Sequence, residues 1–179
     1  QATTTGYMLF KRFNRSISKT SPGVASQNRP SIIFRLADFY LIYAEVANEV
    51  NPSDSRVLTY LNLVRERAGL PKVEILNPGI VGNKELQRAA IQRERQIELA
   101  TEGQRYFDVR RWMIADKDGE GRQNGYAHGM NVRGTINDTE EFNRVVETEK
   151  IVFNRKMYLQ PIPDHEMRKT QNLVQNPGW

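Results

Sequence analysis

Residues 84–112 read KELQRAAIQRERQIELATEGQRYFDVRRW and carry the strongest structural signal in the sequence. In its first part, mostly small or apolar residues recur at the i, i+3, i+4 and i+7 spacing of one helix face. The members of this face are Leu86, Ala89, Ala90, Arg93, Ile97, Ala100 and Thr101. Asn83 is expected to cap the helix at its N-terminus, and Gly103 to end it. Ile91 and Leu99 lie off this face, so we expect the helix to touch neighbours on more than one side.

Arg93 is a charged residue on a helix face whose other members are mostly small or apolar, as in a buried core. A buried guanidinium must find a carboxylate, because an unpaired buried charge is strongly destabilising. The same stretch supplies acids and further arginines, which predicts an ion-pair network that fixes how this helix meets the next one. The expected members are Arg93, Glu94, Arg95, Glu98, Glu102, Arg105, Asp108 and Arg111. On this interpretation Glu98→Ala should cost roughly 3–5 kcal/mol.

Two other interpretations of the acids stay open. Glu94 and Glu98 are four residues apart, so their Cβ atoms would lie about 5–6 Å apart on a helix. That separation suits the carboxylate pair of a retaining glycosidase. A carboxylate-bridged metal site would need Glu-x-x-His motifs, and the only histidines, His128 and His165, are not in such motifs. Since arginines outnumber acids here, the pattern favours ion pairs; we expect no catalysis, no metal and no cofactor.

Composition limits the remaining function classes. A chain of 179 residues suits one domain, here residues 1–179, and has no cysteine for a disulfide, a thiolate metal site or a nucleophile. The net charge of +5 is spread along the chain, which argues against nucleic acid as a partner. No apolar run reaches the length of a membrane span, and the first residues lack the layout of a signal peptide.

Two further helices are predicted before residues 84–112. The first starts at Arg35 and carries an apolar stripe at helical spacing, with more apolar residues on its other side, so we expect burial on most sides. Its stripe is Leu36, Phe39, Tyr40, Tyr43, Ala44, Ala47 and Val50. In the second helix Val57, Leu58, Leu61, Val64 and Ala68 recur at helical spacing. Ser53 or Asp54 can cap the second helix, and Gly69 ends it. Because the connection between the two helices is so short, we expect them to form an antiparallel hairpin similar to one tetratricopeptide unit.

The last third of the chain has weaker signals. Past Gly103, a short helix with an aromatic inner side is expected from Tyr106, Phe107, Val109 and Trp112. Residues 115–137 are glycine-rich and read as a long loop. Residues 116–121 resemble the first positions of a calcium-binding loop. The twelfth position of such a loop is a bidentate glutamate, but here it is Ala127. Residues 140–160 alternate weakly and predict at most short strands.

Three blocks of the sequence resemble the SusD/RagB family of nutrient-binding lipoproteins. The first, ERQIELATEGQRYFDVRRW at 94–112, is similar to the family's long signature motif. The second comprises FRLADFYLIYAEVANEV at 34–50 and LNLVRERAGLP at 61–71, and resembles the family's helix pair. The third, YLQPIPDHEMRKTQNLVQNPGW at 158–179, resembles its closing pattern, with Trp179 where the family generally has tyrosine.

The resemblance implies a mainly α fold. It would be a SusD-like C-terminal domain with a tetratricopeptide-like hairpin, further helices, long irregular loops and few short strands, forming the C-terminal piece of a longer chain. The implied function is non-catalytic binding of glycans or peptides at the outer-membrane surface of Bacteroidetes-type bacteria. The implied lipid anchor belongs to a missing N-terminal part, and the implied partner is a SusC-like TonB-dependent transporter. The rival interpretation is a helical-hairpin module that binds a protein.

Ligand contacts cannot be transferred by motif, because the matching motifs build the scaffold of the family. Within this chain, the loop at 115–137 offers suitable chemistry for a sugar. Tyr126 has a flat apolar face with a hydroxyl at its edge. His128, Asn124 and Asn131 offer neutral donors and acceptors for sugar hydroxyls. These four residues are the candidate binding residues, and the alternative is a loop with one incidental tyrosine.

Overall fold

The computed structural model describes Leu9, Lys11 and residues 31–117, 124–131 and 145–179. Its elements are α1 (Leu36–Val50), α2 (Ser55–Arg67), α3 (Val73–Leu76), η1 (Pro78–Ile80), α4 (Lys84–Glu98), α5 (Gln104–Arg111), β1 (Gly125–Met130), β2 (Val145–Ile151), η2 (Arg155–Tyr158) and α7 (Asp164–Met167). The described residues are mainly helical, which confirms the predicted fold class. None of the described helices is long and apolar enough to cross a membrane.

The chain divides into two compact units. The first, Pro30–Arg111, contains α1 to α5 and is called the helical unit here. The second includes Trp112–Trp179 with the strands and the closing segment, and is called the C-terminal unit. A single domain spanning residues 1–179 stays a prediction.

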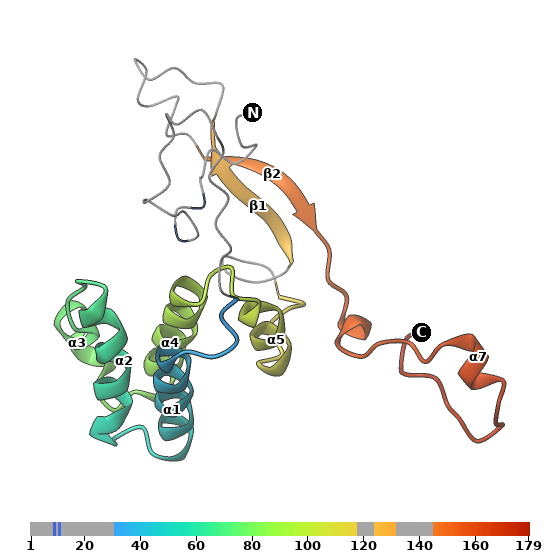
Figure 1. Cartoon of the computed structure of the whole chain (residues 1–179), viewed down its shortest axis with the longest axis horizontal. Helices are drawn as coiled ribbons and strands as arrows, with labels where there is room; N and C mark the ends of the chain where they lie inside the picture. The colour runs from blue at the N-terminus through green and yellow to red at the C-terminus, as the bar shows by residue number, and fades with distance from the viewer. Residues whose placement is uncertain (1–8, 10, 12–30, 118–123, 132–144) are drawn as a thin grey trace. The chain divides into compact units, whose positions relative to one another are not determined.

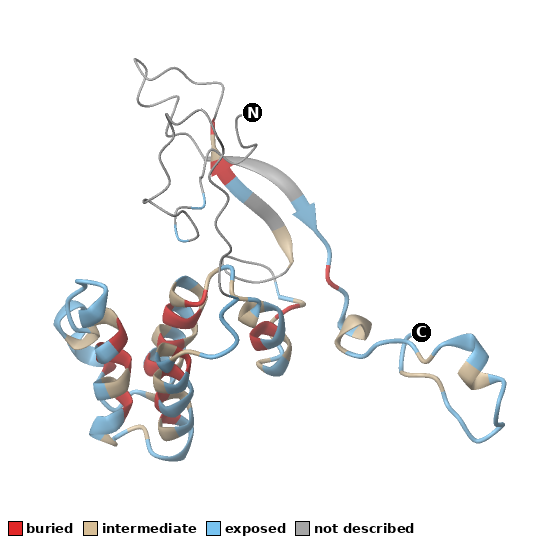
Figure 2. Ribbon diagram, in the orientation of Figure 1, coloured by how far each residue is buried: buried red, intermediate tan, exposed pale blue. Residues whose placement is uncertain are grey.

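The core of the helical unit lies where α1, α2 and α4 meet, with α1 and α2 side by side (Figure 1). Its buried apolar side chains are Leu41, Ala44, Val57, Leu61, Val64 and Ile91. Figure 2 shows the buried positions of α2 on the side that faces α1 and α4. Three of the five residues predicted for the inner stripe of α2 are therefore in the core, which confirms that helix and its orientation.

The helix ends follow local signals. Asp54 caps α2, its Oδ1 accepting a hydrogen bond from the Arg56 amide at 2.9 Å, and Asn83 caps α4 through the Leu86 amide at 3.1 Å. Both caps confirm the prediction. The expected end of α4 at Gly103 is too late, because the helix ends at Glu98. The turn that follows contains Thr101 (φ 68°) and Gly103 (φ 84°) in left-handed conformations before α5 begins.

The buried face of α4 differs from the predicted one. The buried residues of the helix are Gln87, Ile91, Glu94 and Arg95, whereas Leu86, Arg93 and Ile97 are exposed. The two faces differ by a rotation of the helix, and both contain apolar and charged residues. The placement of Arg93 in the core is therefore wrong, and Arg95 is the buried guanidinium of this helix.

Two other helices differ in part from their predicted faces. In α1 the predicted members Tyr40, Ala44 and Ala47 are in or against the core, but Leu36, Phe39 and Val50 are exposed, so burial on most sides is wrong. The buried residues of α1 are Asp38, Leu41, Ala44 and Asn48. In α5 the helix itself was predicted, but its buried residues are Asp108 and Val109. Tyr106 and Phe107 are exposed, so the expected aromatic inner side of α5 is wrong.

The C-terminal unit contains a two-stranded antiparallel sheet, β1 with β2. The register runs from Gly125 opposite Ile151 to Met130 opposite Val145, and a bulge between Ala127 and His128 leaves one extra residue on β2. The short strand expected within 140–160 is thus confirmed as β2. The prediction of a loop throughout 115–137 is wrong for residues 125–130, which form β1.

The closing segment is held by side chains that bind backbone. The Trp179 indole Nε1 donates to the carbonyls of Lys156 and Leu159, both at 3.0 Å, and Lys156 Nζ lies 4.3 Å from the centre of the Trp179 ring. Gln175 pairs with the backbone of Ile162 in both directions, at 2.8 and 2.9 Å. These contacts give the terminal aromatic residue a structural role in this unit.

Candidate functional site

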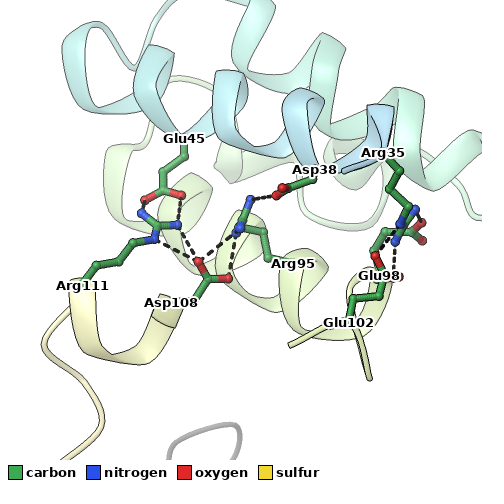
Figure 3. A network of polar contacts seen from close by, with 8 residues as sticks. All are labelled: Arg35, Asp38, Glu45, Arg95, Glu98, Glu102, Asp108 and Arg111. Carbon is green, nitrogen blue, oxygen red and sulfur yellow. Dashed lines mark hydrogen bonds and ion pairs between the residues drawn. The ribbon is translucent and has the colours of Figure 1, made fainter. Parts of the chain in front are cut away.

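The densest group of charged side chains lies between α1, α4 and α5, with Arg95 at its centre (Figure 3). Arg95 is only 3% exposed. Its Nη1 donates to Asp38 Oδ1 at 2.9 Å, and its Nε and Nη2 donate to the two Asp108 oxygens at 2.9 and 3.2 Å. Both aspartates are buried as well. One guanidinium from α4 therefore joins an acid from α1 to an acid from α5.

Arg111 extends this group toward solvent. Its Nε donates to Asp108 Oδ1 at 2.9 Å, and its Nη2 donates to Glu45 Oε2 at 2.6 Å. Burial lowers the pKa of Arg111, but the hydrogen bonds and negative charges of Glu45 and Asp108 outweigh it, so its pKa is raised. Asp108 is thus bound by two arginines, one buried and one partly exposed.

A second group joins the C-terminal end of α4 to the start of α1 and the end of α2. Arg35 Nε donates to Glu102 Oε2 at 2.7 Å, and its two other nitrogens bind the carboxylate and the carbonyl of Glu98. Arg67 reaches the same Glu98 oxygen at 2.7 Å. Glu94 accepts from Arg65 Nη1 at 2.9 Å, one turn earlier. Three arginines from α2 and the start of α1 therefore hold the acidic edge of α4.

Six of the eight predicted network residues lie in these two groups of ion pairs. The structure gives ion pairs to Glu94, Arg95, Glu98, Glu102, Asp108 and Arg111. Arg93 is exposed, and Arg105 is half-buried with a pKa that burial lowers against the opposing charge of Asp108. The sequence reasoning missed the partners Arg35, Asp38, Glu45, Arg65 and Arg67. The signal in the sequence is Asp38, an acidic residue among the apolar residues of the first predicted helix.

The contacts of Glu94 and Glu98 bear on whether these two carboxylates could act as a catalytic pair. Each carboxylate accepts hydrogen bonds from arginines, Glu94 from Arg65 and Glu98 from Arg35 and Arg67. Both carboxylates are therefore bound to arginine side chains of the helical unit. The arrangement suits contacts between helices better than proton transfer to a substrate.

Glu49 forms an exposed pair at the other end of α1, which makes stability depend on pH. Its carboxylate accepts from Arg88 at 2.7 Å and pairs with Lys84 at 3.0 Å. The hydrogen bond from Arg88 lowers the pKa of Glu49 from 4.5 to about 2. Because the folded pKa is the lower one, the contribution is complete above about pH 4.5 and is lost as the pH falls toward 2.

We therefore expect Glu49→Gln to cost about 0.2–1 kcal/mol at neutral pH, the usual range for an exposed pair. The difference in unfolding free energy between wild type and Glu49→Gln should shrink when urea unfolding is repeated near pH 3. A difference that grows on acidification would contradict the assignment.

The four candidate ligand residues lie on or beside β1, and they differ in exposure and in hydrogen bonding. Asn124 Nδ2 donates to the Asp116 carbonyl at 3.4 Å, and its Oδ1 accepts from the Phe153 amide at 3.0 Å, so the amide joins backbone segments. Asn131 is buried, and His128 is exposed. The backbone of Tyr126 pairs with that of Lys150, but its side chain lies outside what the structure describes.

A small group of contacts fixes the base of this hairpin. The Tyr158 hydroxyl donates to Asp116 Oδ1 at 2.6 Å and accepts from the Asp116 amide at 3.1 Å, while its ring meets Phe153 edge-on at 5.0 Å. The hydrogen bond from Tyr158 lowers the pKa of Asp116. Asp116 was the first position of the calcium-like run, whose residues 118–121 lie outside the described residues. Within the described part of the chain, no group of three or more histidine or acidic side chains could hold a metal ion.

A helix hairpin fastened to two more helices by arginine–carboxylate pairs, with a short β-hairpin after it, defines a mainly helical scaffold. A sequence model of the SusD family matches residues 1–179, and the chain belongs to that family. This confirms the resemblance that the motifs indicated.

Similar proteins and solved structures support the same family membership. SusD-like protein P25 of Formosa agariphila is 44% identical over 106 residues, covering 59% of this chain and 19% of that protein. SusD-like protein P2 of the same bacterium is 31% identical over 153 residues, covering 83% of this chain and 26% of that protein. The crystal structure of a SusD-like protein from Bacteroides fragilis is 30% identical, with a TM-score of 0.66 over 83% of this chain and 26% of that one. The chain thus spans about a quarter or less of the length of these proteins.

Proposed function

We propose that this chain is the helical scaffold of a non-catalytic nutrient-binding protein. The protein binds a glycan or peptide at the bacterial outer-membrane surface, to which its lipid anchor holds it, and passes the ligand to a SusC-like TonB-dependent transporter. The observation that carries the proposal is the SusD family match across residues 1–179. The paired state of Glu94 and Glu98 supports the absence of catalysis, because both carboxylates are engaged by arginines.

Within this chain, we place ligand contact on the β1–β2 hairpin rather than on the helices. His128 is exposed on β1, and Tyr126 lies two residues earlier on the same strand. Asn124 and Asn131 become supports of the hairpin, since the first binds backbone on both sides and the second is buried. A sugar ring stacked on Tyr126 with a hydroxyl bonded to His128 fits these residue types.

The test is a calorimetric screen of the full-length protein against soluble polysaccharides and peptides, with reducing-end release assayed in parallel. We expect binding without release of new reducing ends. Turnover of a polysaccharide would contradict the non-catalytic role. A helical-hairpin module for a protein partner, the alternative, predicts that no glycan or peptide in the screen binds.

Tyr126→Ala should then weaken binding of the ligand found in that screen by roughly 1–3 kcal/mol, by analogy with aromatic stacking on nucleic-acid bases. The matched control is Tyr106→Ala, which removes a tyrosine that is exposed on α5 and should leave the affinity unchanged. His128→Ala should have a smaller effect in the same direction. If Tyr126→Ala binds as tightly as wild type, the hairpin is not the contact site.

A further inference from the structure

Asn124 and Gly125 are the one Asn-Gly dipeptide in the sequence, and they lie where the β1–β2 hairpin begins. Asparagine is a chemically labile residue. The backbone nitrogen of the following residue can attack its side-chain amide, and glycine obstructs this attack least because it has no side chain. Position 124 is therefore the asparagine of this chain whose amide is most easily lost.

The fold needs both residues of this pair. Gly125 has φ 101°, a backbone conformation that residues with a side chain rarely adopt, although the space around it would admit a Cβ atom. The Asn124 amide joins two backbone segments, since its Nδ2 donates to the Asp116 carbonyl at 3.4 Å and its Oδ1 accepts from the Phe153 amide at 3.0 Å. An ionised carboxylate could accept from Phe153 but could not donate to Asp116. The labile pair is thus part of what holds the base of the hairpin.

The same contacts oppose the loss of the amide. The reaction bonds the Gly125 nitrogen to Asn124 Cγ, which draws both amide atoms away from their present partners. The backbone of Gly125 is also held in the sheet, where it lies opposite Ile151. The Tyr158 hydroxyl adds to this hold, because it bonds the amide and the carboxylate of Asp116. In the folded chain, the reaction must therefore wait until the base of the hairpin opens.

We propose that Asn124 is a deamidation site whose rate is set by opening of the hairpin base. In the open state, the Gly125 nitrogen loses its proton to solvent and bonds to Asn124 Cγ. The Cγ–Nδ2 bond breaks, and Nδ2 takes a proton from solvent and leaves as ammonia. Water then opens the resulting succinimide ring at one of its two carbonyls. The product is aspartate or isoaspartate, and isoaspartate has one extra atom in its backbone.

Either product weakens the base of the hairpin. The ionised carboxylate of aspartate only accepts hydrogen bonds, so it faces the Asp116 carbonyl without a donor. Isoaspartate lengthens the backbone just before β1, which disturbs the pairing of Gly125 with Ile151. The modification therefore loosens the hairpin irrespective of any ligand.

Incubation of the full-length protein at mildly alkaline pH tests the site, with peptide mass mapping to follow conversion of the amide at position 124. We expect the protein unfolded in guanidinium to deamidate there at least about tenfold faster than the folded protein, because no opening is needed. Tyr158→Phe removes both hydrogen bonds to Asp116 but leaves the dipeptide unchanged, so it should deamidate faster than wild type. The matched control is Tyr106→Phe on α5, which should deamidate at the wild-type rate.

Equal rates in the folded and unfolded protein, or equal rates in wild type and Tyr158→Phe, would overturn the control by the hairpin. An unfolded protein that keeps its amide at position 124 would overturn the site itself. If Tyr158→Phe does not fold, guanidinium below the unfolding transition of wild type replaces it. The rate at position 124 should then rise with denaturant before the protein unfolds, and a constant rate would overturn the proposal.

Hydrogen exchange measures the consequence for the hairpin. Asn124→Asp, which is one of the two products, should exchange its β1 and β2 amides faster than wild type. The control Asn172→Asp makes the same charge change at an exposed position of the C-terminal unit and should not change this exchange. Wild-type exchange in Asn124→Asp would overturn the loosening of the hairpin.

Discussion

Replacing Arg95 with alanine is expected to lower the free energy of unfolding by about 3–5 kcal/mol, because it strands the buried carboxylate of Asp38 and removes one of the two arginines that bind Asp108. Arg95 is bound to Asp38 and Asp108, and all three side chains are buried. Arg111 still reaches Asp108 in the variant, but the structure shows no other ion pair to Asp38 among the described residues. Chemical unfolding of wild type and variant measures the difference.

The matched control for this prediction is Arg93→Ala, two residues earlier on α4. Arg93 is exposed, and an exposed charged side chain contributes only about 0.2–1 kcal/mol even where it is paired. Similar losses in the two variants would contradict the placement of Arg95. A larger loss in Arg93→Ala would favour the helix face that the sequence pattern predicts.

The second large effect is expected from Ile91→Ala, which should cost about 2–5 kcal/mol through lost burial and the cavity left behind. Ile91 is fully buried in the core cluster with Leu41 and Leu61. Thermal or urea unfolding of the variant, with the helix content checked by circular dichroism, provides the measurement.

Ile97→Ala is the control, because Ile97 is the same residue type on the same helix and is 56% exposed. It should cost about 0.5 kcal/mol or less. Equal costs for the two variants would mean that α4 is buried on both sides, as it would be if further chain covers Ile97 in the full-length protein.

Local signals in the sequence predicted the elements of the helical unit well. The caps at Asp54 and Asn83 need only a side chain and an amide two or three residues later, so they can be read without knowledge of the fold. The inner side of α2 was also predictable, because apolar residues such as Val57 and Leu61 occur on one stripe and charged residues lie elsewhere.

The buried face of α4 could not be predicted in the same way. Its sequence contains two candidate stripes, one with Arg93 and Ile97 and one with Ile91 and Arg95. Both contain apolar residues and an arginine, so periodicity alone does not choose between them. Carboxylates far away in sequence make the choice, since Asp38 lies 57 residues from Arg95.

The candidate ligand site was harder still. Two glycines, Gly125 and Gly129, lie within β1 and hide its strand pattern, because glycine favours turns and bulges. Asn124 has the residue type of a sugar contact, but its amide joins Asp116 to Phe153. Whether a polar side chain is available to a ligand depends on neighbours that only the fold supplies.

We propose that the arginine–carboxylate pairs hold the scaffold and take no part in ligand binding. Glu98→Ala in the full-length protein tests this role, with the exposed Glu85→Ala as the control. We expect a loss of about 1.5–3 kcal/mol of stability, the range for hydrogen bonds to charged groups. This is less than the sequence alone implied, because Arg35 keeps Glu102 and Arg67 is largely exposed.

The measurement combines a melting curve with calorimetric titration of the ligand found in the screen. We expect Glu98→Ala to melt at a lower temperature than wild type and to bind the ligand with unchanged Kd. A variant that melts like wild type but no longer binds the ligand would contradict it.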